Sequence, residues 1–164
     1  MTDVLDTVPQ ADRIDTGVVN VLAISEGLSQ AVADTYRLLF KSHAYHWNVE
    51  GPLFHPIHLL TEEQYNDLFQ AADDLAERMR ALGRLAPFQL DAMAKGSIIS
   101  DPAKLPSAHE MIEDLASDHE AVAKRMRKVI AAAEKGNDPV TADLLTGRCA
   151  AHEKAAWMLR ATAK

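Results

Sequence analysis

The chain contains one cysteine, Cys149, and no apolar stretch of membrane-spanning length. A single cysteine excludes an internal disulfide framework and a cysteine-rich zinc site, and we interpret Cys149 as a buried helix residue rather than a reactive thiol. A membrane helix needs about 20 mostly apolar residues, so no membrane partner is expected. The first residues, MTDVLDTVPQADRIDT, lack the basic start and apolar core of a signal peptide, which favours a cytoplasmic location by default.

The chain also lacks an excess of basic residues, because 17 Lys and Arg stand against 24 Asp and Glu, a net charge of −7. Proteins that bind DNA over their whole surface are basic. Because this chain is acidic, a nucleic-acid role would need a local basic patch. An acidic surface can instead attract metal cations. Residues 1–15 are interpreted as a flexible acidic tail, in which one arginine faces four aspartates: Arg13 against Asp3, Asp6, Asp12 and Asp15.

Glycine and proline are also sparse, at seven residues each, while 48% of the residues are apolar. This composition is typical of a helical domain and excludes a disordered chain. Residues 16–164 are long enough for one domain with a sizeable core. A first helix is predicted from about Thr16 to Val49, with apolar residues at helical spacing: Val19, Leu22, Ile24, Leu28, Val32, Tyr36 and Leu39.

The remaining helices are marked by their start and stop residues. A second helix is predicted from about Pro56 to Leu82, with Gly83 at its end. The long connection over 83–107 has room for a short helix at 88–95. A capping box, Ser107 with Glu110, begins a helix that ends near Gly136, and Asp138-Pro139 begins the last, which runs to about Ala163. Four long helices with one long connection predict a four-helix bundle with a crossover.

The second helix carries candidate metal ligands as two i, i+4 pairs, each on one helix face. At about 100° per residue the four share one stripe roughly 100° wide: His58, Glu62, Asp73 and Glu77. Along the axis the two pairs are about 15 residues, or roughly 22 Å, apart. Metal–ligand bonds are only about 2.0–2.2 Å long, so one chain cannot bring both pairs to one ion.

A symmetric dimer can bring them together. If two copies of the second helix cross antiparallel at a two-fold axis, the His58 pair of one chain meets the Asp73 pair of the other, which makes two identical sites. One imidazole with three carboxylates is a hard ligand set that suits iron or manganese. His46 can join from the end of the first helix, with His43 one turn earlier on the same face.

Ordinary structural roles for these residues compete with the interpretation as a metal site. Charged stripes are usually solvated faces, and a lone histidine is more often structural. In favour of a site, four ligands are in phase, and the like charges of Asp73 and Glu77 repel unless a cation or proton offsets them. A conventional di-iron bundle uses Glu-x-x-His motifs within one chain. No histidine here has a glutamate three residues before it, which argues against that kind of site.

At these residues the chain resembles the Dps family, the mini-ferritins, over nearly its whole length. The shared signature is His46-Trp-Asn-Val-x-Gly51, Phe54, His58 and Asp73-x-x-x-Glu77-Arg78, followed by Gly83. The segments Thr141-Ala-Asp-Leu-Leu-Thr146 and His152-Glu-Lys-x-Ala-Trp157 resemble the family's last helix. The resemblance implies an all-α, ferritin-like four-helix bundle with a short extra helix in the B–C connection. It also implies a hollow shell of twelve subunits.

The resemblance further implies a ferroxidase that oxidises Fe(II), usually with hydrogen peroxide, and stores ferric mineral in the shell. Its ligands would be His46, His58 and Glu62 of one subunit with Asp73 and Glu77 of the two-fold neighbour. Glu62 replaces an aspartate found in many relatives, which keeps the charge. Asp143 matches an acidic residue of the family's three-fold pores; its alternative role is a helix N-terminal acid favoured by the macrodipole. Asp138 is interpreted as a cap alone.

Other residues receive structural interpretations. Trp47 can pack over the site and could donate an electron, whereas Tyr45 and Tyr65 are interpreted as packing residues rather than redox relays. His55 and His109 are expected in turns or on the surface. His119 and His152 are expected in the core or at an interface.

Two other functions remain open at this point. One is a nucleoid-associated protein that shields DNA; several members of the family bind DNA through lysine-rich tails, but the tail here is acidic and the other end offers only Arg160 and Lys164. The other is a shell that sequesters zinc or manganese without turnover.

Overall fold

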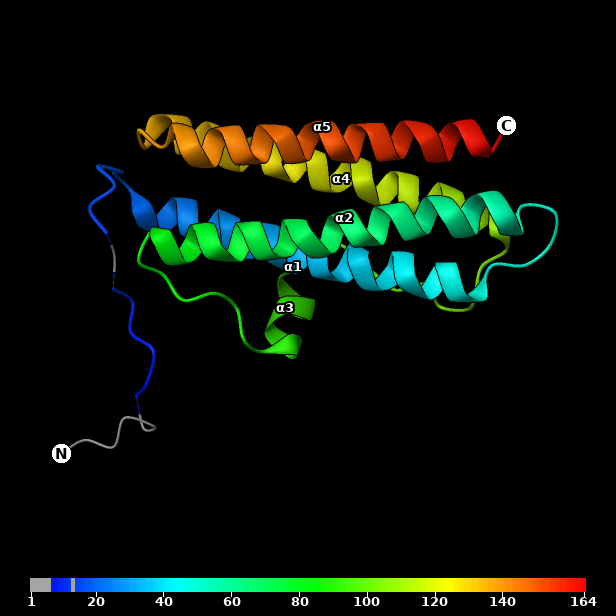
Figure 1. The fold of residues 1–164 in the computed structure, drawn as a ribbon, viewed down its shortest axis with the longest axis horizontal. Coiled ribbons are helices and arrows are strands. Elements are labelled where there is room, and N and C mark those ends of the chain that lie inside the picture. Colours follow the sequence, from blue (N-terminus) through cyan, green and yellow to red (C-terminus); the bar gives the residue numbers. More distant parts are fainter. Residues whose placement is uncertain (1–6, 13) are drawn as a thin grey trace.

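The computed structural model describes residues 7–12 and 14–164. Its helices are α1 (Val21–Asn48), α2 (Phe54–Ala81), α3 (Leu90–Gly96), α4 (Ala108–Lys135) and α5 (Pro139–Thr162). The four long helices lie side by side, and short α3 lies on one side of the bundle next to α1 (Figure 1). No strand occurs in the part of the chain described. The all-α four-helix bundle with a short extra helix in its long connection is therefore confirmed. None of the described helices is long and apolar enough to span a membrane.

The first helix begins later than predicted, at Val21 instead of Thr16. Gly17 and Asn20 both have a left-handed backbone, with φ of 66° and 56°, which a continuous right-handed helix cannot contain. Between them the Val19 N–H donates a 2.9 Å hydrogen bond to the carbonyl of Gly136, at the turn between α4 and α5. A distant backbone partner therefore determines where α1 starts.

The other helix ends follow their sequence signals. Gly83, with φ of 73°, closes α2 in a Schellman arrangement: its N–H bonds to the Arg80 carbonyl, and the Arg84 N–H bonds to the Met79 carbonyl. Pro56 lies in the first turn of α2, where no intrahelical N–H bond is lost.

Both predicted N-caps of the second half of the chain are present. Ser107 and Glu110 form the complete capping box of α4. The Asp138 side chain accepts from the Thr141 N–H at 2.9 Å and so caps α5, with Pro139 following it. The short helix over 90–96 is close to the predicted 88–95.

The core lies between the four long helices. In α1 the predicted periodicity is only partly buried: Ile24, Leu28 and Val32 are in the core, whereas Leu22 and Tyr36 are exposed. Val19 lies before the helix and is exposed as well. Cys149 is buried, as predicted, and its thiol donates to the Ala123 carbonyl. The core also holds large apolar residues of the other long helices: Ile57, Leu68, Leu75, Ile112, Leu115, Met126, Leu145 and Leu159.

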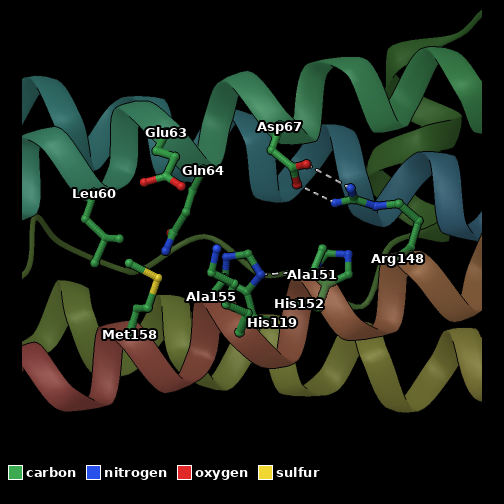
Figure 2. A pocket seen from close by; sticks show the side chains of 11 residues that line it. Leu60, Glu63, Gln64, Asp67, His119, Arg148, Ala151, His152, Ala155 and Met158 are labelled. Carbon is green, nitrogen blue, oxygen red and sulfur yellow. Dashed lines mark hydrogen bonds and ion pairs between the residues drawn. The ribbon is translucent and has the colours of Figure 1, made fainter.

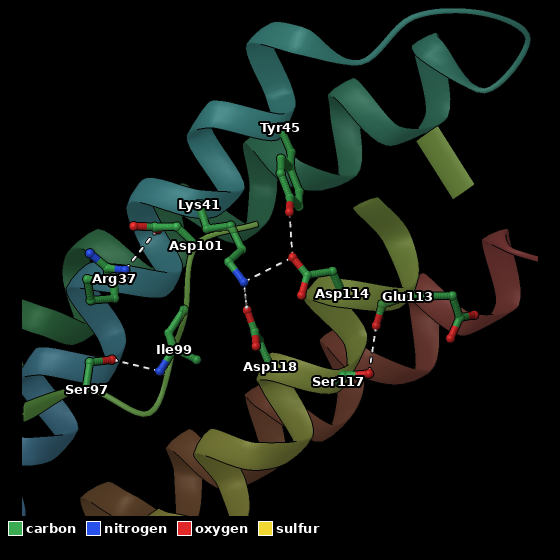
Figure 3. A network of polar contacts seen from close by, with 10 residues as sticks. All are labelled: Arg37, Lys41, Tyr45, Ser97, Ile99, Asp101, Glu113, Asp114, Ser117 and Asp118. Carbon is green, nitrogen blue, oxygen red and sulfur yellow. Dashed lines mark hydrogen bonds and ion pairs between the residues drawn. The ribbon is translucent and has the colours of Figure 1, made fainter. Parts of the chain in front are cut away.

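A polar network joins α1 to α4 beside this core (Figure 3). The Lys41 ammonium lies 3.0 Å from Asp114 and 2.5 Å from Asp118, and its side chain is only 3% exposed. The Tyr45 hydroxyl donates to Asp114 at 2.5 Å, and burial together with that carboxylate raises the pKa of Tyr45. Burial also raises the pKa of Asp118, although Lys41 opposes the effect. Sequence reasoning did not identify this network.

Candidate metal centre

Two histidines meet where α1 ends and α2 begins. Gly51, with φ of 91°, turns the chain between the helices, so that His46 of α1 faces His58 of α2. Their rings are stacked, with centroids 3.7 Å apart and planes at 18°. The structure therefore brings together the two histidines that the sequence proposed as ligands.

Each of the two imidazoles bonds to the backbone of the other residue. Nδ1 of His46 lies 2.8 Å from the His58 carbonyl oxygen, and Nδ1 of His58 lies 3.0 Å from the His46 carbonyl oxygen. A carbonyl oxygen only accepts, so both rings carry their proton on Nδ1. In the neutral form of each ring the Nε2 lone pair is then free to bind a metal, which is how ligating histidines are normally held in place.

Aromatic rings extend this cluster along α1. His43 stacks on Tyr65 of α2 at 4.3 Å and packs against Trp47 at 4.0 Å, while its ring is 6.0 Å from His46. Tyr65 therefore has the packing role expected for it, next to the histidines. Trp47 packs on His43 and is 60% exposed, so within one chain it does not cover the two stacked imidazoles.

The three carboxylates proposed as ligands are all exposed on α2. Among the described residues, no hydrogen bond or ion pair holds the carboxylates of Glu62, Asp73 or Glu77. Their neighbours on other faces of the helix differ: Asp67 binds Arg148 through both oxygens, and Asp74 accepts from Gln70. All three carboxylates of the predicted ligand stripe thus lack a partner among the described residues, as does Glu63, which lies off the stripe.

One subunit does not bring all five proposed ligands together. Because α2 is continuous from Phe54 to Ala81, the roughly 22 Å between its two pairs is maintained. In keeping with this, no group of three His, Cys, Asp or Glu within residues 7–12 and 14–164 could hold a metal ion. A complete site would need ligands from outside the single chain.

Apolar side chains lie exposed on the same face of α2. Phe69 is 66% exposed, and its helical phase of about 20° falls between those of His58 and Glu62. Leu59, at the edge of the stripe, is 49% exposed. Trp47 and Phe54 add exposed aromatic area beside the two histidines. Exposed apolar groups that gather around polar ones in this way are typical of a surface that contacts another protein.

Asp143 lies on α5 beside the end of α2 and is exposed. With Glu77 and Arg78 it lines a surface groove between the two helices. The first turn of α5 holds no acidic residue, so Asp143 lies beyond the turn where the helix macrodipole is felt most strongly. The macrodipole interpretation of Asp143 is correspondingly weak.

Asp138 has a second partner that sequence reasoning missed. Besides capping α5, its fully buried carboxylate accepts from the Arg78 guanidinium at 2.6 Å, and Arg78 also donates to the Thr141 hydroxyl at 2.9 Å. Interpreting Asp138 as a cap alone was therefore incomplete. These bonds fix the end of α2, and with it Glu77, against the start of α5. The only sequence signal was the arginine that directly follows Glu77.

His55 and His109 are exposed, whereas His119 and His152 are buried, in agreement with the sequence-based expectations.

Comparisons of the sequence and of the fold with known proteins find the same kind of relative. The family model for the ferritin-like domain matches residues 25–164. The DNA protection during starvation protein 2 of Bacillus anthracis is 35% identical over 138 residues, covering 84% of this chain and 94% of that protein. The DNA protection during starvation protein 1 of Deinococcus radiodurans is 35% identical over 140 residues, covering 84% and 67%. The crystal structure of Dps from Staphylococcus aureus superposes with a TM-score of 0.84 at 32% identity, covering 90% of this chain and 98% of that one.

Proposed function

Because the chain belongs to the Dps family of ferritin-like proteins, we propose that it is an iron-storage ferroxidase that protects the cell and its DNA from oxidative damage. It would oxidise Fe(II) with hydrogen peroxide at sites shared by two subunits, and keep the ferric product inside a shell of twelve. The observation that carries the proposal is the pair of stacked histidines with free Nε2 atoms, in phase with three unpaired carboxylates.

The exposed face of α2 supports a site shared between two subunits. If two subunits pair by a two-fold axis with their α2 helices antiparallel, His46, His58 and Glu62 of one subunit face the Asp73–Glu77 pair of the other. The same contact would bury Phe69 and Leu59, which are exposed in the single chain. It would also place a cation beside Asp73 and Glu77, whose like charges otherwise repel.

The ligand set suits iron as the substrate. Two neutral imidazoles and three carboxylates form an oxygen-rich site, and anionic oxygen ligands favour Fe(III) over Fe(II). Two Fe(II) ions supply two electrons to one peroxide, which with two protons becomes two waters, so no hydroxyl radical is released. The exposed Trp47 ring, in contact with His43, is available as an additional electron donor.

Asp143 supports a role in iron entry. It lies in a groove with Glu77, and a ring of such carboxylates around a three-fold axis would attract Fe(II). Substituting Asp143→Asn should slow iron uptake into the shell while oxidation at the histidine site keeps its rate at saturating iron.

Direct DNA binding by the tail is not part of the proposal. We retain the division into an acidic tail over residues 1–15 and a bundle domain over 16–164. Asp12 and Asp15 are exposed, while Asp3, Asp6 and Arg13 lie outside the described residues. A net charge of −7 opposes phosphate binding. A low-salt gel shift with supercoiled DNA should show no complex, and a salt-sensitive complex would favour DNA shielding instead.

The first test is oxidation of Fe(II), added without oxygen to the metal-free protein, on addition of peroxide. We expect rapid ferric absorbance and iron that co-elutes with protein at about 216 kDa, twelve times the 18.0 kDa chain. His58→Ala should lose the acceleration, whereas the matched variants His55→Ala and Glu134→Gln, which alter exposed residues, should keep it. Oxidation that His58→Ala leaves unchanged, with metal still bound by the protein, would favour passive sequestration of metal.

Mixing two inactive variants tests whether subunits share the site. His58→Ala and Glu77→Gln each damage every site when assembled alone. In mixed shells, a dimer of the two variants would contain one intact site, so random pairing should restore about a quarter of the wild-type activity. A site contained within one chain would show no recovery.

A further inference from the structure

A second polar site lies inside the bundle, away from the stripe on α2. His119 of α4 and His152 of α5 are buried, and their Nδ1 atoms are 2.9 Å apart (Figure 2). They line a partly enclosed cavity of about 130 Å³, together with residues of α2 and α5 that include Leu60, Gln64, Arg148 and Met158. Figure 2 shows Gln64 reaching from α2 into this space, above the sulfur of Met158.

The protons of the histidine pair can be counted from its geometry. A single proton lies between the two Nδ1 atoms, so one ring donates and the other accepts. The donating ring has a bare Nε2 lone pair, and the accepting ring carries its proton on Nε2. Neither Nε2 atom has a partner in the described part of the chain, and both side-chain polar atoms of Gln64 are also unpaired. A buried polar atom without a partner is costly, so the cavity favours a polar or ionic guest.

The donors around the cavity are neutral and include a soft atom. The pair supplies one imidazole nitrogen, Met158 a thioether sulfur and Gln64 an amide oxygen. Thioether and imidazole ligands select Cu(I), an ion that forms stable complexes with a coordination number of two or three. The ligating ring would donate its Nδ1 proton to the second histidine, as metal-bound histidines usually do to a neighbour.

The surrounding charges also favour a monovalent ion. Arg148, which also lines the cavity, is paired with Asp67 through two hydrogen bonds that offset its positive charge in part. At the exposed rim, Glu63 and Lys154 carry opposite charges. Because the cost of burying an ion grows with the square of its charge, a neutral cavity accepts Cu(I) more readily than a divalent ion.

We propose that the cavity between α2, α4 and α5 is a Cu(I) site, formed by the His119–His152 pair and Met158 and separate from the ferroxidase ligands. The proposal does not depend on iron oxidation, because no residue is shared between the two sites.

Anaerobic titration of the metal-free shell with Cu(I), in competition with a chromophoric Cu(I) chelator, tests the proposal. We expect one Cu(I) per subunit, beyond any held by His46 and His58, that is lost in His119→Gln and bound about tenfold or more weakly in Met158→Leu. The matched variant His109→Gln, exposed on the same helix, should bind normally. His58→Ala, which removes a candidate iron ligand, should also retain this copper ion. Copper X-ray absorption should show both nitrogen and sulfur ligands in the wild type and no sulfur in Met158→Leu.

Three results would overturn the proposal, and the first two concern the proposed ligands. One is a wild-type shell that binds no Cu(I), which would leave the cavity to water. The other is equal binding in the wild type, His119→Gln and Met158→Leu, with assembly checked by size exclusion. Loss of copper only in Cys149→Ala would likewise refute it, because that thiol lines a separate groove beside Arg127.

Discussion

Replacing Lys41 by methionine tests the polar network between α1 and α4. The substitution keeps an unbranched apolar side chain but removes the cation that lies between Asp114 and Asp118. Breaking a buried ion pair from one side costs about 3–5 kcal/mol, because the charge that remains is left uncompensated. The side chains of Asp114 and Asp118 are 35% and 15% exposed, so water can solvate them in part. We therefore expect a loss near the lower end, about 3 kcal/mol of unfolding free energy.

Urea denaturation followed by circular dichroism, at one fixed protein concentration, measures this loss in the assembled protein. The triple variant Lys41→Met, Asp114→Asn, Asp118→Asn removes the charges together and should recover most of the stability. The loss in the single variant should also shrink as the pH falls from 7 towards 5, because burial already raises the pKa of Asp118 and loss of the cation raises it further. A loss below about 1 kcal/mol, or a triple variant as unstable as the single one, would refute the reasoning.

Three further predictions concern stability. Ser107→Ala removes the cap of α4 and should cost about 1 kcal/mol in the same urea assay, whereas no change would show that the cap is dispensable. Gly136→Ala would place a Cβ atom 2.7 Å from the carbonyl oxygen of Val19, so we expect a loss of about 1–3 kcal/mol; wild-type stability would show that the contact yields easily. Burial lowers the pKa of His152 and lowers that of His119 to about 4, which favours the neutral rings in the folded state. The metal-free protein should therefore lose stability as the pH falls from about 6.5 to 4, by about 3 kcal/mol for His119 alone, and a variant with glutamine at both positions should lose this dependence.

The helices could be predicted because their end signals are local. The Ser107 capping box, the Asp138 cap and the Gly83 stop each act through backbone groups within a few residues, and all three are present. The start of α1 could not be predicted, since it depends on a hydrogen bond from Val19 to Gly136, which is more than a hundred residues away.

The candidate site likewise has features that could be predicted from the sequence and features that could not. Helical spacing sufficed to put Glu62, Asp73 and Glu77 on one exposed face of α2, because α2 is regular. The reciprocal bonds of His46 and His58 could not be inferred, since they depend on how the turn between the helices folds back. Contacts between distant residues, such as those of Lys41 and the buried His119 pair, leave no periodic signal in the sequence.

The reciprocal bonds between His46 and His58 have a consequence for the proton balance of metal loading. Both Nδ1 protons are committed to carbonyl oxygens, so iron can bind these rings only through Nε2. Iron that binds a neutral ring displaces no proton from it, whereas a ring protonated on Nε2 must release that proton first. Acid that is still released on anaerobic Fe(II) addition at a pH where both rings are neutral would therefore come from coordinated water or from the carboxylates, and pH-stat records at several pH values would separate it from the histidine contribution.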